Sequence, residues 1–194
     1  MMEVLAHSSA PLVKGNPEGA LGNFAADAAL SEGNRLARKM GLDTASWAVL
    51  NNGGLRKSLP AGDITLSDMY EVFPFENKLE ILTCSGSTAT SLFRYIASMN
   101  GTPVSGLSLV LQSADSSVKS ATVGSMRYDS TLTYRILTVD YLANGGDRFT
   151  MFNEALKRET LDEKLRDVMI RFVRDKGKSG QEIVPLKDGR IRYE

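Results

Sequence analysis

The sequence predicts an α+β domain. Helical and strand periodicities alternate along the 194 residues, but they do not follow the regular strand–helix–strand rhythm of a doubly wound sheet. Apolar residues make up 42% of the chain, which is enough for one buried core in a chain of this length. No apolar run approaches the roughly 18–20 residues that a membrane-spanning helix needs.

The charge balance and cysteine content exclude further classes. Lysine plus arginine equals aspartate plus glutamate at 23 each, so the chain lacks the basic footprint of a nucleic-acid-binding protein. Cys84 is the only cysteine and cannot form an intrachain disulfide. Residues 1–11 lack the charged and apolar regions of a signal peptide.

The first predicted helix begins near Asn16. Asn16, Pro17 and Glu18 are residue types favoured at the N-cap, the first helical position and the first turn. Apolar side chains follow at helical spacing, and Gly41 is suited to end the helix. We therefore predict a flexible N-terminal segment over residues 1–15 and a single domain over residues 16–194.

Three elements are expected in the next part of the chain. Residues 45–50 are an apolar run that reads as a buried strand ending at a glycine-rich loop. A short helix is predicted over residues 64–72, with Thr65 or Ser67 as its cap. Residues 79–83 alternate in the manner of a strand.

The remaining elements follow similar signals. A helical apolar face predicts a helix over residues 87–99, and alternation predicts strands at 107–111 and 132–136. Residues 160–163 form a capping-box pattern that predicts the start of another helix. Residues 187–190 read as a turn before a short last strand.

Two glycine-rich segments carry the strongest functional signal. One reads NNGGLR at residues 51–56 and is followed by FPFEN at 73–77, and the other reads YLANGGDRF at 141–149. Glycines let the backbone approach a ligand, and arginine offers a planar fork to a phosphate or carboxylate. An aspartate can accept from two vicinal hydroxyls, and two aromatic rings can hold a flat base. Phosphate, sugar and base together indicate a nucleotide.

At these residues the chain resembles the C-terminal, substrate-recognition domain of the 5′-nucleotidase family, which includes bacterial UDP-sugar hydrolases and animal ecto-5′-nucleotidases. The similar motifs occur in order: an opening helix at residues 18–28, NNGGLR, GDIT at 62–65, FPFEN and YLANGGDRF. The resemblance implies a four-layer αββα domain with mixed sheets. It also implies recognition of a nucleotide or nucleoside.

The resemblance further implies a role for each of six residues. Arg56 would bind phosphate, Asp147 the ribose hydroxyls, and Asn51 would be an amide that faces the ligand. Phe75 and Tyr141 would hold the base, which Asn77 would also contact. The substrate-binding residues expected from the sequence are therefore Asn51, Arg56, Phe75, Asn77, Tyr141 and Asp147.

Several of these residues have structural alternatives. Arg56 could be a surface arginine paired with Asp63, and Asp147 could be an ordinary turn residue. Phe73 and Phe75 are two positions apart in an aromatic cluster, and we expect their side chains to point in opposite directions. One can then be core while the other faces a base, and the motif match selects Phe75.

Three positions depart from the family pattern. Tyr141 lies where the family usually has phenylalanine, and it adds a hydroxyl to the stacking face. Many members carry an arginine shortly before the opening helix, where this chain has only Lys14 as a basic residue. Arg148 replaces the glycine that normally follows the aspartate, and three alternatives stay open: it could clash with a base, supply the missing phosphate charge or be a solvated surface residue.

The family's two metal ions lie in a separate N-terminal domain. This chain has one histidine, His7, which we expect to be exposed to solvent, and it lacks the ligand cluster of a two-metal phosphoesterase site. We therefore expect no catalytic residue and no metal site in this chain. A pair of divalent ions (Zn, Mn or Mg) is expected in a metallophosphoesterase partner domain or polypeptide.

The leading hypothesis is a nucleotide or nucleoside recognition domain of a 5′-nucleotidase-type phosphohydrolase that acts in nucleotide catabolism. The resemblance implies a periplasmic or extracellular location. One alternative is a free-standing nucleoside or nucleotide binding protein with no catalytic partner. Another keeps the fold but changes the substrate to a nucleotide-sugar or a 2′,3′-cyclic nucleotide. No nucleic-acid partner is expected.

Overall fold

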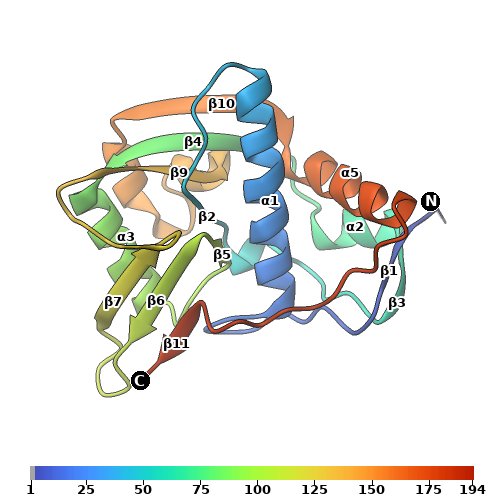
Figure 1. Cartoon of the computed structure of the whole chain (residues 1–194), viewed down its shortest axis with the longest axis horizontal. Helices are drawn as coiled ribbons and strands as arrows, with labels where there is room; N and C mark the ends of the chain where they lie inside the picture. The colour runs from blue at the N-terminus through green and yellow to red at the C-terminus, as the bar shows by residue number, and fades with distance from the viewer. Residues whose placement is uncertain (1–2) are drawn as a thin grey trace.

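The computed structural model describes residues 3–194, in which the strands form three sheets (Figure 1). The largest sheet has the order β10-β4-β9-β2-β5, the second β11-β6-β7-β8, and the third β1-β3. The strands are β1 (Val4–Ser8), β2 (Trp47–Val49), β3 (Gly62–Thr65), β4 (Lys78–Ser85), β5 (Val104–Ser105), β6 (Leu107–Leu111), β7 (Val118–Val123), β8 (Met126–Arg127), β9 (Thr133–Val139), β10 (Lys157–Lys164) and β11 (Ile191–Tyr193).

Both larger sheets are mixed. In the five-stranded sheet, β2 runs parallel to β9, whereas the other neighbouring strands are antiparallel. In the four-stranded sheet, β11 runs parallel to β6, and the remaining pairs are antiparallel. The predicted α+β fold with mixed sheets is therefore confirmed.

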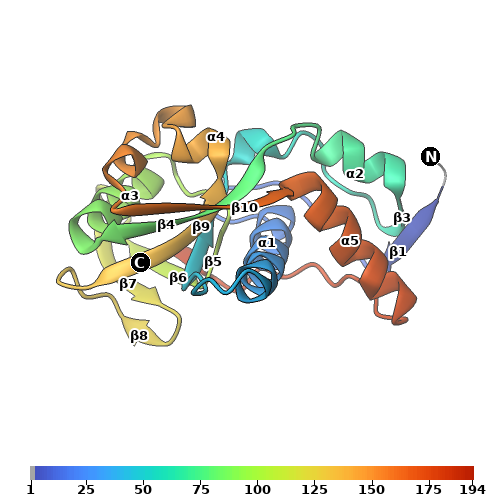
Figure 2. The same ribbon diagram turned by 90° about the horizontal axis from the view of Figure 1, so that it is seen from above.

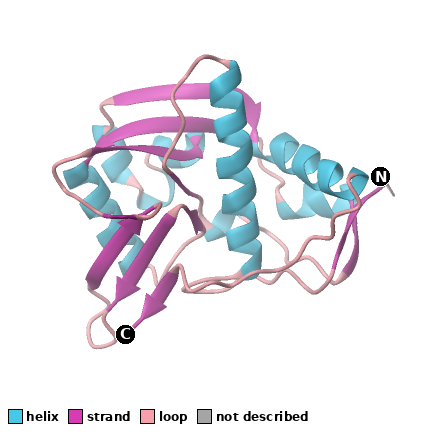
Figure 3. Ribbon diagram, in the orientation of Figure 1, coloured by secondary structure: helices cyan, strands magenta, loops and turns pink. Residues whose placement is uncertain are grey.

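Helices pack on both sides of the five-stranded sheet. Figure 2 shows α1 on one side of this sheet and α4 on the other, and Figure 3 shows the long α1 beside both larger sheets. Between the sheets, α3 contacts β4, β9 and β7. Helix α1 can approach closely because Gly33 faces Leu137 of β9, whose Cδ1 atom would lie 2.3 Å from an added Cβ. The helices are α1 (Ala20–Lys39), α2 (Leu66–Val72), α3 (Gly86–Ser98), α4 (Asp140–Ala143) and α5 (Leu165–Lys178).

The first helix begins later than the sequence predicts. The N-cap of α1 is Gly19, not Asn16. Glu18 is buried, and its carboxylate accepts hydrogen bonds from the Asn23 side chain and from the backbone N–H of Asp188 at 2.8 Å. These long-range bonds, which the local pattern does not contain, hold the segment outside the helix, so the prediction of a cap at Asn16 was wrong.

The two predicted helix caps after residue 60 have opposite outcomes. Thr65 caps α2 as predicted, because its hydroxyl accepts from the Asp68 N–H at 3.2 Å while the Asp68 carboxylate accepts from the Thr65 N–H at 2.9 Å. The prediction that the capping-box pattern at residues 160–163 begins a helix was wrong. That segment continues β10, where Thr160 pairs with Glu80 of β4, and the cap of α5 is Lys164. Pairing with a long neighbouring strand overrides the local pattern.

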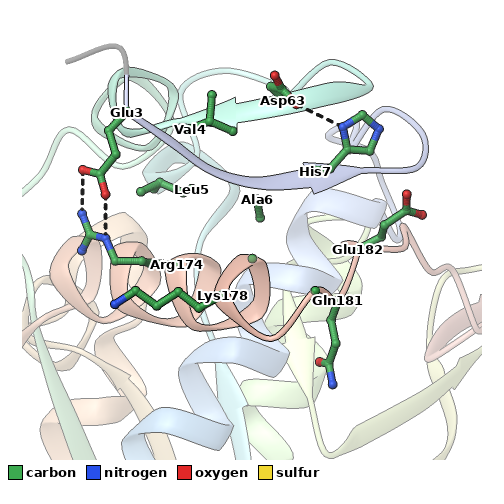
Figure 4. A pocket seen from close by; sticks show the side chains of 12 residues that line it. Glu3, Val4, Leu5, Ala6, His7, Asp63, Arg174, Lys178, Gln181 and Glu182 are labelled. Atoms are coloured by element: carbon green, nitrogen blue, oxygen red, sulfur yellow. Dashed lines mark hydrogen bonds and ion pairs between the residues drawn. The ribbon is translucent and has the colours of Figure 1, made fainter.

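The N-terminal segment belongs to the packed fold, although the sequence analysis expects residues 1–15 to be flexible. Strand β1 pairs with β3 and lies against α5 (Figure 4), and Leu12 is fully buried. Contact with α5 is close, because a Cβ at Gly177 would lie 1.9 Å from the Leu5 carbonyl oxygen. Residues 1–2 lie outside the described residues.

Polar side-chain contacts lie near both ends of β1, at Glu3 and at His7 (Figure 4). The Glu3 carboxylate accepts two hydrogen bonds at 3.0 Å from the Arg174 guanidinium, and this interaction lowers the pKa of Glu3. The exposed His7 ring lies with Nδ1 3.1 Å from an oxygen of Asp63. No helix among residues 3–194 is long and apolar enough to span a membrane.

Candidate functional site

Three chain segments meet at one edge of the five-stranded sheet. Strands β2 and β9 are parallel, so their carboxyl ends lie at the same edge, where ligands commonly bind in sheets of this kind. Strand β4 runs antiparallel to β9, so its amino end lies there as well. The fold therefore brings together the loop after β2, the segment before β4 and the helix and loop after β9.

A cleft of about 290 Å³ lies among these segments. The structure places all six residues selected from the sequence around it, together with two glycines of the first loop. Its lining residues are Asn51, Gly53, Gly54, Arg56, Phe75, Asn77, Tyr141 and Asp147.

Asp147 is held from three directions. The Asn51 amide donates to one carboxylate oxygen at 2.5 Å, and the Tyr141 hydroxyl donates to the other at 2.8 Å. The backbone carbonyl of Asp147 accepts from the Tyr95 hydroxyl at 2.5 Å. The bond to Asp147 raises the pKa of Tyr141. These contacts join the two glycine-rich loops and fix the carboxylate at the cleft.

Two glycines make room for these side chains. A Cβ at Gly54 would lie 2.8 Å from the amide oxygen of Asn51, and a Cβ at Gly146 would lie 2.6 Å from Cζ of Tyr141. Both distances are shorter than real Cβ contacts, so a larger residue at either position would displace a side chain that lines the cleft.

The two aromatic residues of the cleft are exposed. Phe75 is 47% and Tyr141 is 44% exposed, although large apolar side chains are usually buried. Phe73 is only 2% exposed, so it is part of the core while Phe75 is not. Residues two apart in a regular strand would share a face, but Phe73 is the C-cap of α2 and its backbone is not extended. An exposed ring at a cleft offers a flat apolar face to a ligand.

Arg56 presents a free cation beside Phe75. Its Cζ atom lies 6.0 Å from the centre of the Phe75 ring, and its backbone N–H donates to the carbonyl of Val72 at 2.9 Å. The pairing with Asp63 considered from the sequence does not form, since Asp63 contacts His7 instead. Among residues 3–194, no carboxylate lies within ion-pair distance of the Arg56 guanidinium.

A model of the family described as "5′-nucleotidase, C-terminal domain" matches residues 4–154. The chain belongs to this family. The resemblance stated from the sequence motifs is therefore confirmed, and the cleft lies within the matched part of this 5′-nucleotidase C-terminal domain.

Relatives and solved structures agree with this assignment. The chain is 30% identical to an apyrase from Tabanus yao, with 89% of this chain and 34% of the relative covered. It is 27% identical to a trifunctional nucleotide phosphoesterase from Bacillus subtilis, with 89% of this chain and 12% of the relative covered. A 5′-nucleotidase precursor from Thermus thermophilus has a similar structure, with a TM-score of 0.84, 27% identity and coverage of 100% of this chain and 40% of that chain. This chain thus spans less than half the length of each.

The structure of this 5′-nucleotidase C-terminal domain adds supporting residues that the sequence analysis did not select. Tyr95 of α3 packs edge-on against Phe149, and its hydroxyl donates to the backbone carbonyl of Asp147. Arg158 of β10 donates to the Asn144 side chain at 2.7 Å and to buried Glu80 at 2.9 Å. These partners lie far apart in the sequence, and no local motif indicates them.

Arg148 lies outside the cleft that contains Arg56. It lines a neighbouring cleft of about 410 Å³, together with Asn16 and Tyr95. Lys14 is exposed and lines neither cleft. The remaining departure from the family pattern, the Tyr141 hydroxyl, is the group that bonds to Asp147.

The part of the domain that the structure describes contains no group of three or more histidine, cysteine, aspartate or glutamate side chains suited to hold a metal ion. Cys84 of β4 is fully buried, and burial raises the pKa of its thiol to about 12. This cysteine is therefore part of the core, away from the cleft residues.

Proposed function

We propose that this chain is the nucleotide or nucleoside recognition domain of a 5′-nucleotidase-type phosphohydrolase. The observation that carries the proposal is the convergence of a free arginine, two exposed aromatic rings and a glycine-flanked aspartate on one cleft of about 290 Å³. These are the groups needed for phosphate, base and ribose, and they come from three segments that are far apart in the sequence.

Each group has a role in this proposal. Phe75 and Tyr141 hold the base between their rings, and Asn77 contacts its polar edge. Asp147 accepts from the ribose hydroxyls, because each carboxylate oxygen retains a lone pair beyond its bond to Asn51 or Tyr141. Arg56 binds the phosphate through its planar guanidinium.

Catalysis requires a second component. The family's C-terminal domain pairs with a metallophosphoesterase domain. A pair of divalent metal ions held by that domain would activate the water that attacks phosphorus. The residues of the present chain bind and orient the ligand for that domain. Because the base and ribose are already held in one position, the ligand loses less entropy on reaching the transition state.

The biological setting in this proposal is nucleotide catabolism outside the cytoplasm, in the periplasm or the extracellular space. A related protein from Listeria monocytogenes is named a cell wall protein, which supports this location. The names of the apyrase and the nucleotide phosphoesterase support a nucleotide ligand.

Isothermal titration calorimetry with AMP and adenosine tests the proposal. Replacement of Phe75 or Tyr141 by alanine should weaken binding by about 1–3 kcal/mol, the usual loss for one aromatic residue that stacks on a base. Tyr70→Ala is the matched control, because Tyr70 is another exposed aromatic residue, at 42%, and does not line the cleft. Unchanged affinity in both cleft variants, or no binding by the unmodified chain, would overturn the proposal.

A further inference from the structure

A second cleft adjoins the first at the Asp147 carboxylate. Its volume is about 410 Å³, and it shares Asn51, Gly53 and Asp147 with the cleft that contains Arg56. A ligand with its ribose at Asp147 would therefore have its ribose hydroxyls at the boundary between the two clefts. A substituent on one of those hydroxyls would extend into the second cleft.

Among residues 3–194, Arg148 is the only cationic residue that lines the second cleft. Apart from Asp147, the rest of the described lining is uncharged and contains both apolar side chains, such as Met99, and polar ones. The Asn52 amide, for example, donates to the Asn16 side-chain oxygen at 2.9 Å. Asp147 is the only anionic residue of the lining, and both of its oxygens are already bonded to neutral donors. The guanidinium is thus the group that selects the charge of a ligand in this cleft.

The loop that carries Arg148 exposes its side chain at the second cleft. Asp147 and Arg148 are consecutive left-handed residues with φ values of 48° and 63°. This conformation is unfavourable for a residue other than glycine. Asp147 has its hydrogen bonds to offset the cost, whereas Arg148 has no ion pair or side-chain hydrogen bond among the described residues. The Arg148 side chain is exposed and lines the second cleft, so its guanidinium is available to a ligand there.

We propose that the second cleft is an anion subsite, in which Arg148 binds a phosphate ester on the 2′ or 3′ oxygen of the ribose. This inference rests on the proposed function, which locates the ribose at Asp147. The 5′-phosphate remains with Arg56, and the unsubstituted ribose hydroxyl remains with Asp147. The ligand class is therefore nucleotides with a second phosphate on the ribose.

Calorimetry with three ligands tests the subsite: AMP, adenosine 2′,5′-bisphosphate and adenosine 3′,5′-bisphosphate. At least one bisphosphate should bind about three- to tenfold more tightly than AMP, as expected for one added charge-assisted contact at a half-open site. In Arg148→Gln, the dissociation constant of AMP divided by that of the tighter-binding bisphosphate should fall to about one. Arg148→Gly is a second variant, because glycine suits the left-handed backbone and preserves the loop.

The controls separate this subsite from general charge attraction. Arg127→Gln removes an exposed arginine of β8 and should leave the ratio unchanged. If AMP binds but neither bisphosphate binds more tightly, the subsite is overturned while the proposed function stands. If a bisphosphate still binds more tightly than AMP in both Arg148 variants, the subsite is also overturned. If none of the three ligands binds, the proposed function and the subsite fail together.

Discussion

Asp147 and Arg56 lie on the same cleft but are held differently. The Asp147 carboxylate is fixed by Asn51 and Tyr141, whereas the Arg56 guanidinium contacts only the Phe75 ring through its charge. An aspartate already bonded in the free protein loses little conformational entropy when a ligand binds. The arginine is available because no carboxylate among residues 3–194 neutralises it. The chemistry of the cleft therefore combines a preorganised acceptor with an exposed cation that has no ion-pair partner among residues 3–194.

Replacement of Arg56 by lysine should weaken the binding of AMP more than the binding of adenosine. Only the phosphorylated ligand needs the planar fork of arginine, and an ammonium ion contacts phosphate as a point charge. We expect AMP to lose about 1–2 kcal/mol of binding free energy and adenosine a few tenths, as measured by calorimetry. Arg127→Lys in β8 is the control. An equal loss for both ligands would make Arg56 a structural residue.

At the scale of the elements, close packing depends on small residues at a few positions. Helix α5 approaches β1 only because position 177 is glycine. Strand β4 lies in the middle of the large sheet and carries the buried thiol of Cys84. Both features affect stability rather than the chemistry of the cleft, and each leads to a prediction.

Gly177→Ala should destabilise the fold by about 1–3 kcal/mol, the usual cost of overpacking. The added Cβ would lie 1.9 Å from the Leu5 carbonyl oxygen, a backbone atom that cannot move without β1. Urea denaturation followed by circular dichroism measures the change. Asp175→Ala, at an exposed position on the same helix, is the control. Equal midpoints for the two variants would contradict the close contact of β1 with α5.

Stability should fall at alkaline pH because of Cys84. The folded-state pKa of this thiol is about 12, above the ordinary value of about 8.5. The protonated thiol therefore contributes its full stabilisation below the unfolded pKa, and this contribution is lost as the pH rises toward the folded pKa. Between pH 7 and pH 10 we expect a loss of about 1–2 kcal/mol in the free energy of unfolding.

The comparison that isolates this effect is Cys84→Ala, measured by urea denaturation at both pH values. Lysine and tyrosine residues titrate in both proteins, so only the difference between their pH dependences reports on the thiol. An identical pH dependence in the two proteins would show that the buried thiol does not resist ionisation.

At the scale of the whole molecule, recognition and catalysis are expected to be separate. Purified chain supplied with Mn²⁺, Zn²⁺ or Mg²⁺ should release no phosphate from AMP above background, because residues 3–194 contain no cluster of metal-ligand side chains. A colorimetric phosphate assay measures this, and His7→Ala should give the same result. Metal-dependent release that persists after repurification and in His7→Ala would contradict the prediction.

The sequence was sufficient where the signal was local. The Thr65 cap and the buried strand around Trp47 depend on neighbouring residues, and the structure contains both. The six cleft residues came from ordered motifs. That they line one cleft follows from the pairing of β2 with β9, which no motif states.

The sequence was insufficient where distant residues decide the outcome. Glu18 bonds to Asp188, and these bonds delay the start of α1. Thr160 pairs with Glu80, and this pairing extends a strand through a capping-box pattern. Strand β1 is short and becomes ordered only through β3 and α5. In each case, a tertiary contact is stronger than the local preference.

The parallel pairing of β2 with β9 also has a consequence for folding. Trp47 pairs with Ile136, so the two loops that hold Asn51 and Asp147 meet only after a long stretch of intervening chain has been enclosed. Such non-local pairings form slowly, and the cleft cannot exist before them. A nucleotide that binds the cleft would therefore bind only chains with the native strand order and would shift the folding equilibrium toward them by mass action. The ligand would thus stabilise only those chains in which the five-stranded sheet has formed with its native strand order.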